Sequence, residues 1–565
     1  MSNPYWPKTL IFIGAGSTAQ LSSPPTVKQG KLFKVLGLDE TQKPLAQRVK
    51  EAFDSPIHHQ SIVDLLCCLG DKLESNLYDF TDEEKESAKR LFPNLEEKKR
   101  LDLVRQLREI YDWDALKKII KIVPGFDCDD CNDAIFLLEL FNIVDFHIKD
   151  GHGFYTSLSE EDSPLGHQYK YFIPPQRLHD ARTCMLMLIN LFFFCKYQDM
   201  LSDKEKREKL SEYSRFVEAL TQVMQKEAAE KYNKAIATSR DYYLFPYSII
   251  SLNYDPIWLW LYFVNQKKAN ENSRYVGAPA KPIKLFNDFG TFMGIREIDN
   301  PKSILPRYPF NESVVQRIND SNHSSDRVVR IGKFYFPHGC CCIRECKNCG
   351  KMITAMSDSW DLLSNSVLPN PIIPAFQKSK ARSEIEKKAF EEGRPDAIEC
   401  PFCGNLTYAS DNPLIMQTSF KGNHPPYLEE IQREAKVNLE NTDHIVMFGY
   451  SLPVDDITWR TVIATRKARL HKHSKKALLC SIITGYGGPN EWIVGKDKIN
   501  DLINECKNDE DKSTKYSIET VKQAISIFGI ENIRVYVGGI PDFWTKYHGS
   551  LEDRARDMIN PKWKS

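Results

Sequence analysis

Residues 9–18 read Thr9-Leu10-Ile11-Phe12-Ile13-Gly14-Ala15-Gly16-Ser17-Thr18, an apolar run that ends in two glycines and two hydroxyl residues. An unbroken run of β-prone apolar residues is typical of a strand buried on both faces, as in a parallel sheet. A glycine pair at the end of such a strand, followed by small residues, is how a strand turns into a helix over a phosphate. We therefore expect a parallel sheet with a phosphate-binding turn, although the short glycine motif alone is weak evidence.

Further apolar runs predict strands along the rest of the chain. They lie at residues 247–252, 283–286, 328–336, 444–448, 477–483 and 533–537. Helical patterns separate several of them, notably at 425–439 and 513–528. Strands that alternate with helices indicate an α/β fold. The prediction is a doubly wound, mostly parallel, Rossmann-like sheet.

The region from residue 41 to 244 has a different pattern and predicts a large α-helical insertion. Its long charged segments predict helices at 82–122, 131–149, 176–197 and 202–236. In the last segment apolar residues recur at helical spacing, at Leu210, Tyr213, Val217, Leu220 and Met224. Such an apolar face contacts either a partner or the protein's own helical layer. The sheet core would then consist of residues 1–40 and 245–565, with a zinc module at 337–405 inserted in it.

The composition excludes several classes of protein. The chain of 565 residues is 42% hydrophobic and 27% charged, as globular proteins are, and its formal net charge is 0. Without an overall positive field we expect no nucleic acid as a direct ligand. The longest apolar run, 185–194, is too short for a membrane helix, and the N-terminus does not resemble a signal peptide. An odd number of cysteines, 15, with several adjacent, suits reduced thiols in a cytoplasmic protein.

Two Cys-x2-Cys pairs predict a metal site. Cys346 and Cys349 form the first pair, Cys400 and Cys403 the second, and a glycine follows each pair. Four thiolates complete the tetrahedral shell of a Zn²⁺ ion, and a closed shell indicates a structural ion. The alternative is a set of buried free cysteines.

A third pair, Cys128 and Cys131, has no visible partner pair, and whether it binds anything stays open.

Polar or glycine residues follow three more predicted strands. Asn253 and Asp255 follow the strand at 247–252, His338 follows the strand at 328–336, and Gly449 and Ser451 follow the strand at 444–448. In open α/β sheets, ligands bind outside the carboxyl ends of the strands. These loops and the turn at residues 14–18 can therefore converge on one cleft.

The order of these motifs resembles the sirtuin superfamily: a Gly-Ala-Gly turn, a Ser-x-Asn-x-Asp loop, His-Gly before a four-cysteine module, and Gly-x-Ser-Leu. The resemblance covers about half of the chain. It implies that NAD is bound by Gly14, Ala15, Gly16, Thr18, Asn253, Asp255, Gly449 and Ser451. It also implies that His338 and Asn253 are catalytic.

The differences from the family pattern indicate which branch of the superfamily the chain resembles. Leu252 stands where protein deacylases have a glutamine, and residues 22–27 lack the phenylalanine and arginine of their glycine loop. With the helical insertion, the chain looks like the bacterial sirtuin-like NAD hydrolases of anti-phage defence, of Thoeris or Kongming type. The resemblance implies cleavage of NAD to ADP-ribose and nicotinamide, gated by oligomerisation or by a co-encoded sensor protein. The alternatives are an NAD-dependent protein deacylase and a non-catalytic nucleotide-binding assembly subunit.

Two histidines in the stretch 145–154, His147 and His152, lie beside acidic residues. They could line a cleft, or they could mark a helix end with a glycine stop.

Overall fold

The computed structural model describes most of the sheet core and parts of the region 41–244. The described residues are 8–18, 21, 133–157, 170–186, 204–233, 235–273, 275–276, 281–291, 293–297, 304–307, 312–320, 326–356, 383–391, 397–408, 411–415, 424–453, 456–473, 477–485, 488–506, 512–546 and 549–560, with a few isolated positions between 82 and 119.

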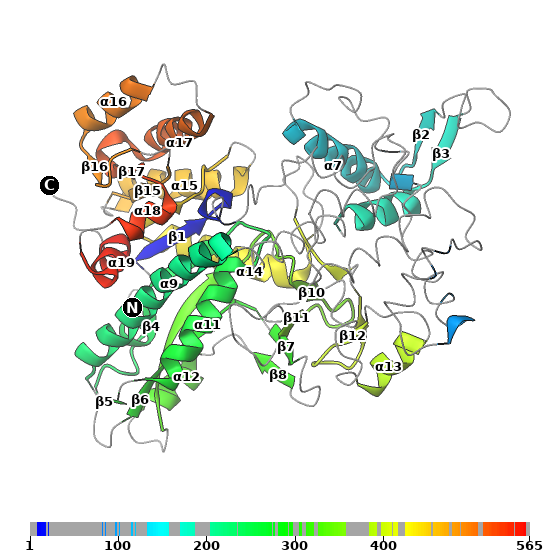
Figure 1. The fold of residues 1–565 in the computed structure, drawn as a ribbon, viewed down its shortest axis with the longest axis horizontal. Helices are drawn as coiled ribbons and strands as arrows, with labels where there is room; N and C mark the ends of the chain where they lie inside the picture. The colour runs from blue at the N-terminus through cyan, green and yellow to red at the C-terminus, as the bar shows by residue number, and fades with distance from the viewer. Residues whose placement is uncertain are drawn as a thin grey trace.

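A nine-stranded sheet forms the centre of the described structure, in the order β16-β17-β15-β14-β1-β4-β9-β6-β5 (Figure 1). Its strands are β1 (Thr9–Ile13), β4 (Leu244–Ser251), β5 (Tyr275–Val276), β6 (Lys281–Asp288), β9 (Val328–Tyr335), β14 (His444–Phe448), β15 (Leu479–Ile483), β16 (Ile493–Val494) and β17 (Ile533–Tyr536). The inner strands run parallel, and the edge strands β16 and β5 run antiparallel to their neighbours. The α/β class and the mostly parallel sheet are therefore confirmed.

The strands form where the apolar runs predict them. Every residue of β1, β4 and β14 is buried, which explains why these segments are not alternately polar. The helices predicted at 425–439 and 513–528 are α14 (Pro426–Asn441) and α17 (Lys512–Phe528).

Helices cover both faces of the sheet. Phe12 lies beside Met447 in the register, so Phe12 and Phe448 point to opposite faces. Phe448 packs edge-on against Trp258 at a ring-centroid distance of 5.3 Å, whereas Phe12 packs edge-on against Trp459 at 5.8 Å. One helical layer contains α9 (Lys204–Glu230), α11 (Ile257–Glu271), α18 (Ile540–Thr545) and α19 (Leu551–Ile559), and the other contains α14, α15 (Ile457–His473) and α17. Three further helices are α10 (Arg240–Tyr243), α12 (Glu312–Asn319) and α16 (Lys496–Glu505).

The apolar face of α9 lies inside the protein. Leu210, Val217 and Met224 are each at most 1% exposed and belong to the same hydrophobic cluster as the strands. Phe216, on the same helix, stacks on Trp544 of α18 at 4.8 Å. Of the two alternatives for this face, closure of the protein's own helical layer is confirmed. The predicted division of the chain at residue 244 stays a prediction, although α9, which precedes it, packs on the sheet.

The rest of the region 41–244 is less purely helical than expected. It contains α7 (Asp133–Asp150) and a helical segment at 175–186, but also a hairpin of β2 (Phe154–Ser157) and β3 (Lys170–Ile173). The prediction of a largely α-helical insertion does not include this hairpin, whose strands are only four residues long. Most of the helix predicted at 82–122, as well as Cys128 and Cys131, lies outside the described residues.

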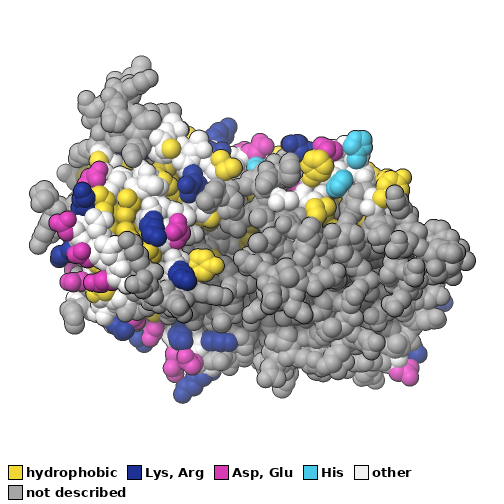
Figure 2. Space-filling view, turned by 90° about the horizontal axis from the view of Figure 1, so that it is seen from above, with side chains coloured by type: hydrophobic (Ala, Val, Ile, Leu, Met, Phe, Trp, Pro, Cys, Tyr) yellow, Lys and Arg dark blue, Asp and Glu magenta, His cyan; other side chains and the backbone are white. Residues whose placement is uncertain are grey.

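Gly151 ends α7, as the glycine stop predicts. Its φ is +67°, its N–H donates to the carbonyl of Ile148, and the His152 N–H donates to the carbonyl of His147. Figure 2 shows histidine side chains beside acidic and hydrophobic ones on the surface over this part of the molecule. His147 and His152 thus lie at a helix end.

The four cysteines lie beside a second, four-stranded sheet in the order β10-β11-β7-β8. Its strands are β7 (Met293–Glu297), β8 (Ile304–Arg307), β10 (Ile343–Glu345) and β11 (Met352–Met356), and the neighbouring elements are β12 (Ile398–Glu399), β13 (Leu406–Thr407) and α13 (Glu384–Glu391). Because β11 pairs with β7, this sheet includes residues that precede the predicted start of the zinc module at residue 337.

Among the described residues, no helix combines the length and the apolar character that crossing a membrane requires.

Two glycine turns meet at the carboxyl ends of β1 and β14. The Gly14 N–H donates to the Phe448 carbonyl at 3.1 Å, and the Gly16 N–H donates to the Gly449 carbonyl at 2.9 Å. A Cβ on Gly449, whose φ is +60°, would lie 2.1 Å from the Ser17 nitrogen. A Cβ on Gly14 would lie 2.6 Å from the Gly449 oxygen. The contact between the two turns therefore requires glycine at both positions.

We predict that Gly449→Ala destabilises the protein more than Gly151→Ala does. Both glycines have positive φ, +60° and +67°, but a Cβ at residue 151 would meet nothing within 4 Å. The left-handed conformation should cost each variant about 1 kcal/mol, and the clash at 449 should add about 1–3 kcal/mol. Urea unfolding measures both losses. Equal losses would contradict the turn-to-turn contact.

Candidate functional site

The loops after β1 and β4 are joined by side-chain hydrogen bonds. The Thr18 hydroxyl donates to Asp255 Oδ2 at 3.3 Å, and Asn253 Nδ2 donates to the Ser17 hydroxyl at 3.4 Å. Asn253 and Asp255 are both 5% exposed. The structure thus brings three of the predicted site residues, Thr18, Asn253 and Asp255, into one buried cluster.

The start of α11 holds this cluster in place. The Ile257 N–H donates to Asp255 Oδ1 at 3.1 Å, so the carboxyl group accepts from one of the N–H groups that a helix start leaves without an intrahelical partner. The indole of Trp258 donates to the Ser17 hydroxyl at 2.9 Å. Ser17 belongs to the glycine-turn motif in the sequence but is not among the predicted site residues, and Trp258 belongs to no sequence motif.

His338 follows β9 in a loop that is fixed by its backbone. The His338 carbonyl accepts from the Ile415 N–H at 2.9 Å. The next residue, Gly339, has a φ of +79°, and a Cβ there would lie 2.3 Å from the Pro413 oxygen. His338 itself is 4% exposed. The segment that follows the second cysteine pair therefore packs directly on the His338 loop.

The His338 ring faces a carboxylate from the loop after β14. Its Nε2 lies 3.5 Å from Asp456 Oδ1, and the Tyr450 hydroxyl donates to Asp456 Oδ2 at 2.7 Å. Sequence analysis did not select Asp456. The residue directly precedes α15, where an acidic side chain is common for capping reasons alone.

A main-chain hydrogen bond joins the loops after β4 and β9 as well. The Cys341 N–H donates to the Tyr254 carbonyl at 2.9 Å, and the Tyr254 hydroxyl donates to the Ile415 carbonyl at 2.8 Å. The loops after β1, β4, β9 and β14, at the carboxyl ends of these strands, are thus linked to one another, as the sequence led us to expect.

Four N–H groups of the glycine turn at 14–18 donate to backbone carbonyls. Those of Ser17 and Thr18 donate within the turn, whereas those of Gly14 and Gly16 donate to Phe448, at the end of β14, and to Gly449. Ala15 is half-buried and Gly16 is exposed at the surface of the turn. The N–H groups of these four residues are therefore already paired within the turn or with β14 and Gly449, and the role of the turn in binding phosphate stays a prediction.

The remaining predicted residues lie on the same edge. Gly449 contacts the β1 turn, and its N–H donates to the Ile483 carbonyl at 3.0 Å. Ser451 is exposed, and the next residue, Leu452, has a φ of +52°. A positive φ on a leucine indicates a strained turn. The Arg460 guanidinium donates to the Leu452 carbonyl at 2.9 Å, which holds this turn.

Burial dominates the electrostatics of Asp255. It raises the pKa of this carboxyl group from 3.8 to about 7, against the hydrogen bonds from Ile257, Thr18 and Asn253, which lower it. The neighbouring thiol of Cys340 raises the pKa further. Asp255 is thus a carboxyl group that gains or loses its proton near neutral pH.

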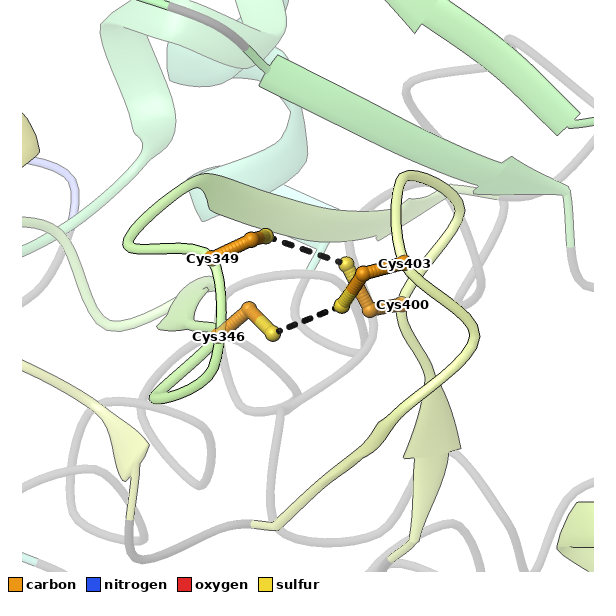
Figure 3. A group of neighbouring side chains, drawn as sticks. All are labelled: Cys346, Cys349, Cys400 and Cys403. Atoms are coloured by element: carbon orange, nitrogen blue, oxygen red, sulfur yellow. Dashed lines mark hydrogen bonds between the residues drawn. The ribbon is translucent and has the colours of Figure 1, made fainter.

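The four cysteines of the two Cys-x2-Cys pairs converge on one point (Figure 3). Their sulfur atoms all lie within 4.8 Å of one another, with 3.5 Å between Cys346 and Cys403 and 3.7 Å between Cys349 and Cys400. Tetrahedral ligands at the Zn–S distance of about 2.3 Å would be about 3.8 Å apart. The four cysteines can therefore hold a metal ion.

Each pair lies on a turn of the same form. The Gly350 N–H donates to the Cys346 carbonyl at 2.7 Å, and the Gly404 N–H donates to the Cys400 carbonyl at 2.9 Å. Both glycines have positive φ, +64° and +75°, which explains why a glycine follows each pair.

A scan against protein-family models finds no match for the chain, and a search of curated proteins also finds none.

We predict that Asp255 makes the protein less stable as the pH rises from about 4 to about 7. In this range the folded chain keeps a proton on Asp255 that the unfolded chain has lost, so the free energy of unfolding falls with pH. Asp255→Asn keeps the acceptor oxygen and should remove this part of the pH dependence, at most about 4 kcal/mol. Urea unfolding at several pH values measures it.

The matched control is Asp443→Asn, because the side chain of Asp443 is 53% exposed. This variant should follow the wild-type pH dependence. If Asp255→Asn follows it too, Asp255 does not carry the proton in the folded protein.

Proposed function

We propose that this protein is a sirtuin-like NAD hydrolase that cleaves the nicotinamide–ribose bond to give ADP-ribose and nicotinamide. One observation carries the proposal: the loops after β1, β4, β9 and β14 are linked to one another at the carboxyl ends of these strands, and Asn253, Asp255 and His338 are each buried in these loops. These are the positions that the resemblance to sirtuins assigns to NAD.

The strand order supports a ligand at this edge. β4 lies beside β1 on one side, whereas β14, followed by β15, lies on the other side of β1. The order in which strands are added to the sheet therefore reverses between β1 and β14. In doubly wound sheets such as the Rossmann fold, ligands bind at the carboxyl ends of the strands where the order reverses. The glycine turns of residues 14–16 and 449 lie at this point.

The proposed reaction needs only a few catalytic groups from the protein. The departing nicotinamide leaves an oxocarbenium-like ribose, which water attacks when no acyl-lysine is present. In this scheme His338 acts as the base near the ribose hydroxyls or the water, and Asn253 orients the ribose or the water. Asp255 contributes beside the nicotinamide end of the substrate, and residues 14–18, Gly449 and Ser451 contact the rest of the dinucleotide.

We further propose that the four-cysteine cluster binds a structural Zn²⁺. All four positions of a tetrahedral shell would be filled by Cys346, Cys349, Cys400 and Cys403, which leaves no position for a reacting water.

The wider setting is also part of the proposal. A cytoplasmic enzyme that drains NAD needs an inactive state, so we propose control by oligomerisation or by a co-encoded partner in anti-phage defence. The apolar face of α9 does not support this control, because it is buried within the chain.

We predict that the purified protein releases nicotinamide from NAD, alone or together with the product of a neighbouring gene. His338→Ala and Asn253→Ala should each lower this rate by about 10²–10⁴ and leave the fold intact, because each removes a positioned polar group at the site. The measurement is nicotinamide release by chromatography, with thermal unfolding to check the fold. His179→Ala, on the helical segment at 175–186, and Asn272→Ala, at the C-cap of α11, are the matched controls, because both residues are exposed.

Other outcomes select other functions. Release of nicotinamide only with an acetyl-lysine peptide, with O-acetyl-ADP-ribose as product, would identify a deacylase. Tight NAD binding without any release would identify a binding subunit. Normal cleavage by both His338→Ala and Asn253→Ala would reject their catalytic roles.

We predict about one zinc ion per chain by elemental analysis. Cys346→Ser and Cys400→Ser should each lose most of this zinc and lower the melting temperature, because metal binding in such modules contributes to folding. Cys506→Ser, which lies outside the cluster, should keep its zinc. Well-folded wild-type protein without zinc would reject the metal assignment.

A further inference from the structure

An imidazole, a carboxylate and a phenol form a buried chain across the candidate site. His338 Nε2 lies 3.5 Å from Asp456 Oδ1, and the Tyr450 hydroxyl donates to Asp456 Oδ2 at 2.7 Å. The exposed fractions of His338, Asp456 and Tyr450 are 4%, 1% and 7%. In the sheet, β4 and β1 lie between β9 and β14. The three side chains therefore extend from the end of β9 to the end of β14.

The carboxylate is held independently of the histidine. The Asp456 N–H donates to the Pro453 carbonyl, and the Arg460 N–H donates to the Asp456 carbonyl, both at 3.1 Å, at the start of α15. Tyr450 stacks on Phe12 of β1 with ring centroids 5.5 Å apart and an angle of 12° between the rings. Asp456 therefore has a defined position to which the His338 ring must adjust.

The chemistry of the three groups determines the proton arrangement. A carboxylate only accepts hydrogen bonds, and one of its oxygens already accepts from Tyr450. His338 Nε2 is the ring nitrogen that faces the other oxygen, at 3.5 Å, so this acceptor favours the tautomer with the proton on Nε2. In that tautomer Nδ1 is the ring nitrogen that can accept a proton.

We propose that Asp456, held in place by Tyr450, is a positioning residue that fixes the ring orientation and the tautomer of His338. The proposal rests on the proposed function only where it concerns turnover, since the tautomer is a property of the protein without substrate. Other titratable groups in these loops, namely Asp255 and the thiols of Cys340, Cys341 and Cys342, are not altered in any variant below.

The deciding variant is Asp456→Asn. An asparagine has nearly the same shape, but its amide can donate to the ring and so favours the opposite tautomer. Tyr450→Phe removes the phenol hydroxyl and introduces no charge. Asp443→Asn is the matched control, because its side chain is 53% exposed.

The first measurement needs no activity. Protein with ¹⁵N-labelled histidine gives the tautomer from its ring-nitrogen chemical shifts, and His338→Ala identifies the resonances of residue 338. We expect a proton on Nε2 in the wild type and in Asp443→Asn. In Asp456→Asn the proton should move to Nδ1, and Tyr450→Phe should give a mixture of tautomers.

The second measurement is steady-state NAD cleavage. A misplaced tautomer should lower kcat by about 10²–10⁴ in Asp456→Asn and change KM much less, because the ring acts in the reaction and not in binding. Tyr450→Phe should lower kcat about fivefold, since the loss of one buried hydrogen bond is worth about 1 kcal/mol.

The two measurements separate the positioning role from the proposed function. An unchanged ring tautomer in Asp456→Asn overturns the positioning role, whether or not the wild type cleaves NAD. A changed tautomer in a protein that never releases nicotinamide supports the positioning role and rejects NAD hydrolysis. If Asp456→Asn does not fold, Tyr450→Phe decides, because an unchanged single tautomer there overturns the proposal and a mixture supports it.

Discussion

The backbone contact between the glycine turns after β1 and β14 organises the centre of the molecule. Gly14, Gly16 and Gly449 approach so closely that no Cβ fits between the turns at Gly14 and Gly449. Two main-chain hydrogen bonds, from Gly14 and from Gly16, join the turns. The first strand of the chain is in this way attached to a strand that follows more than 400 residues later, and the loops of both strands are held at one edge.

The same constraint explains why so many polar groups are buried there. A buried polar group is costly without a hydrogen-bond partner, so each one needs a neighbour at a defined position. Ser17 meets Asn253 and Trp258, Thr18 meets Asp255, and Asp456 meets Tyr450. The glycine turns supply these positions, and the result is a network of buried hydrogen bonds at the carboxyl ends of β1, β4 and β14.

The cysteine module is hydrogen-bonded to the loop that follows β9 at the carboxyl ends of the strands. Asn412, which follows the second cysteine pair, donates through its amide to the carbonyls of Cys340, Cys341 and Ile343. The Ile415 N–H donates to the carbonyl of His338 itself. A metal ion at the four cysteines would therefore stabilise the loop that contains His338.

The sequence by itself determined the α/β class, the positions of the main strands, the four-cysteine cluster and the four loops that meet at one edge. These features follow from local patterns, because a buried parallel strand must be apolar throughout and a knuckle needs its cysteines at a short spacing. Only the tertiary structure decided that the apolar face of α9 closes the protein's own core and that Asp456 faces His338. Both facts depend on contacts between residues far apart in the chain. An amphipathic helix or an acidic residue before a helix has the same local pattern whatever it packs against.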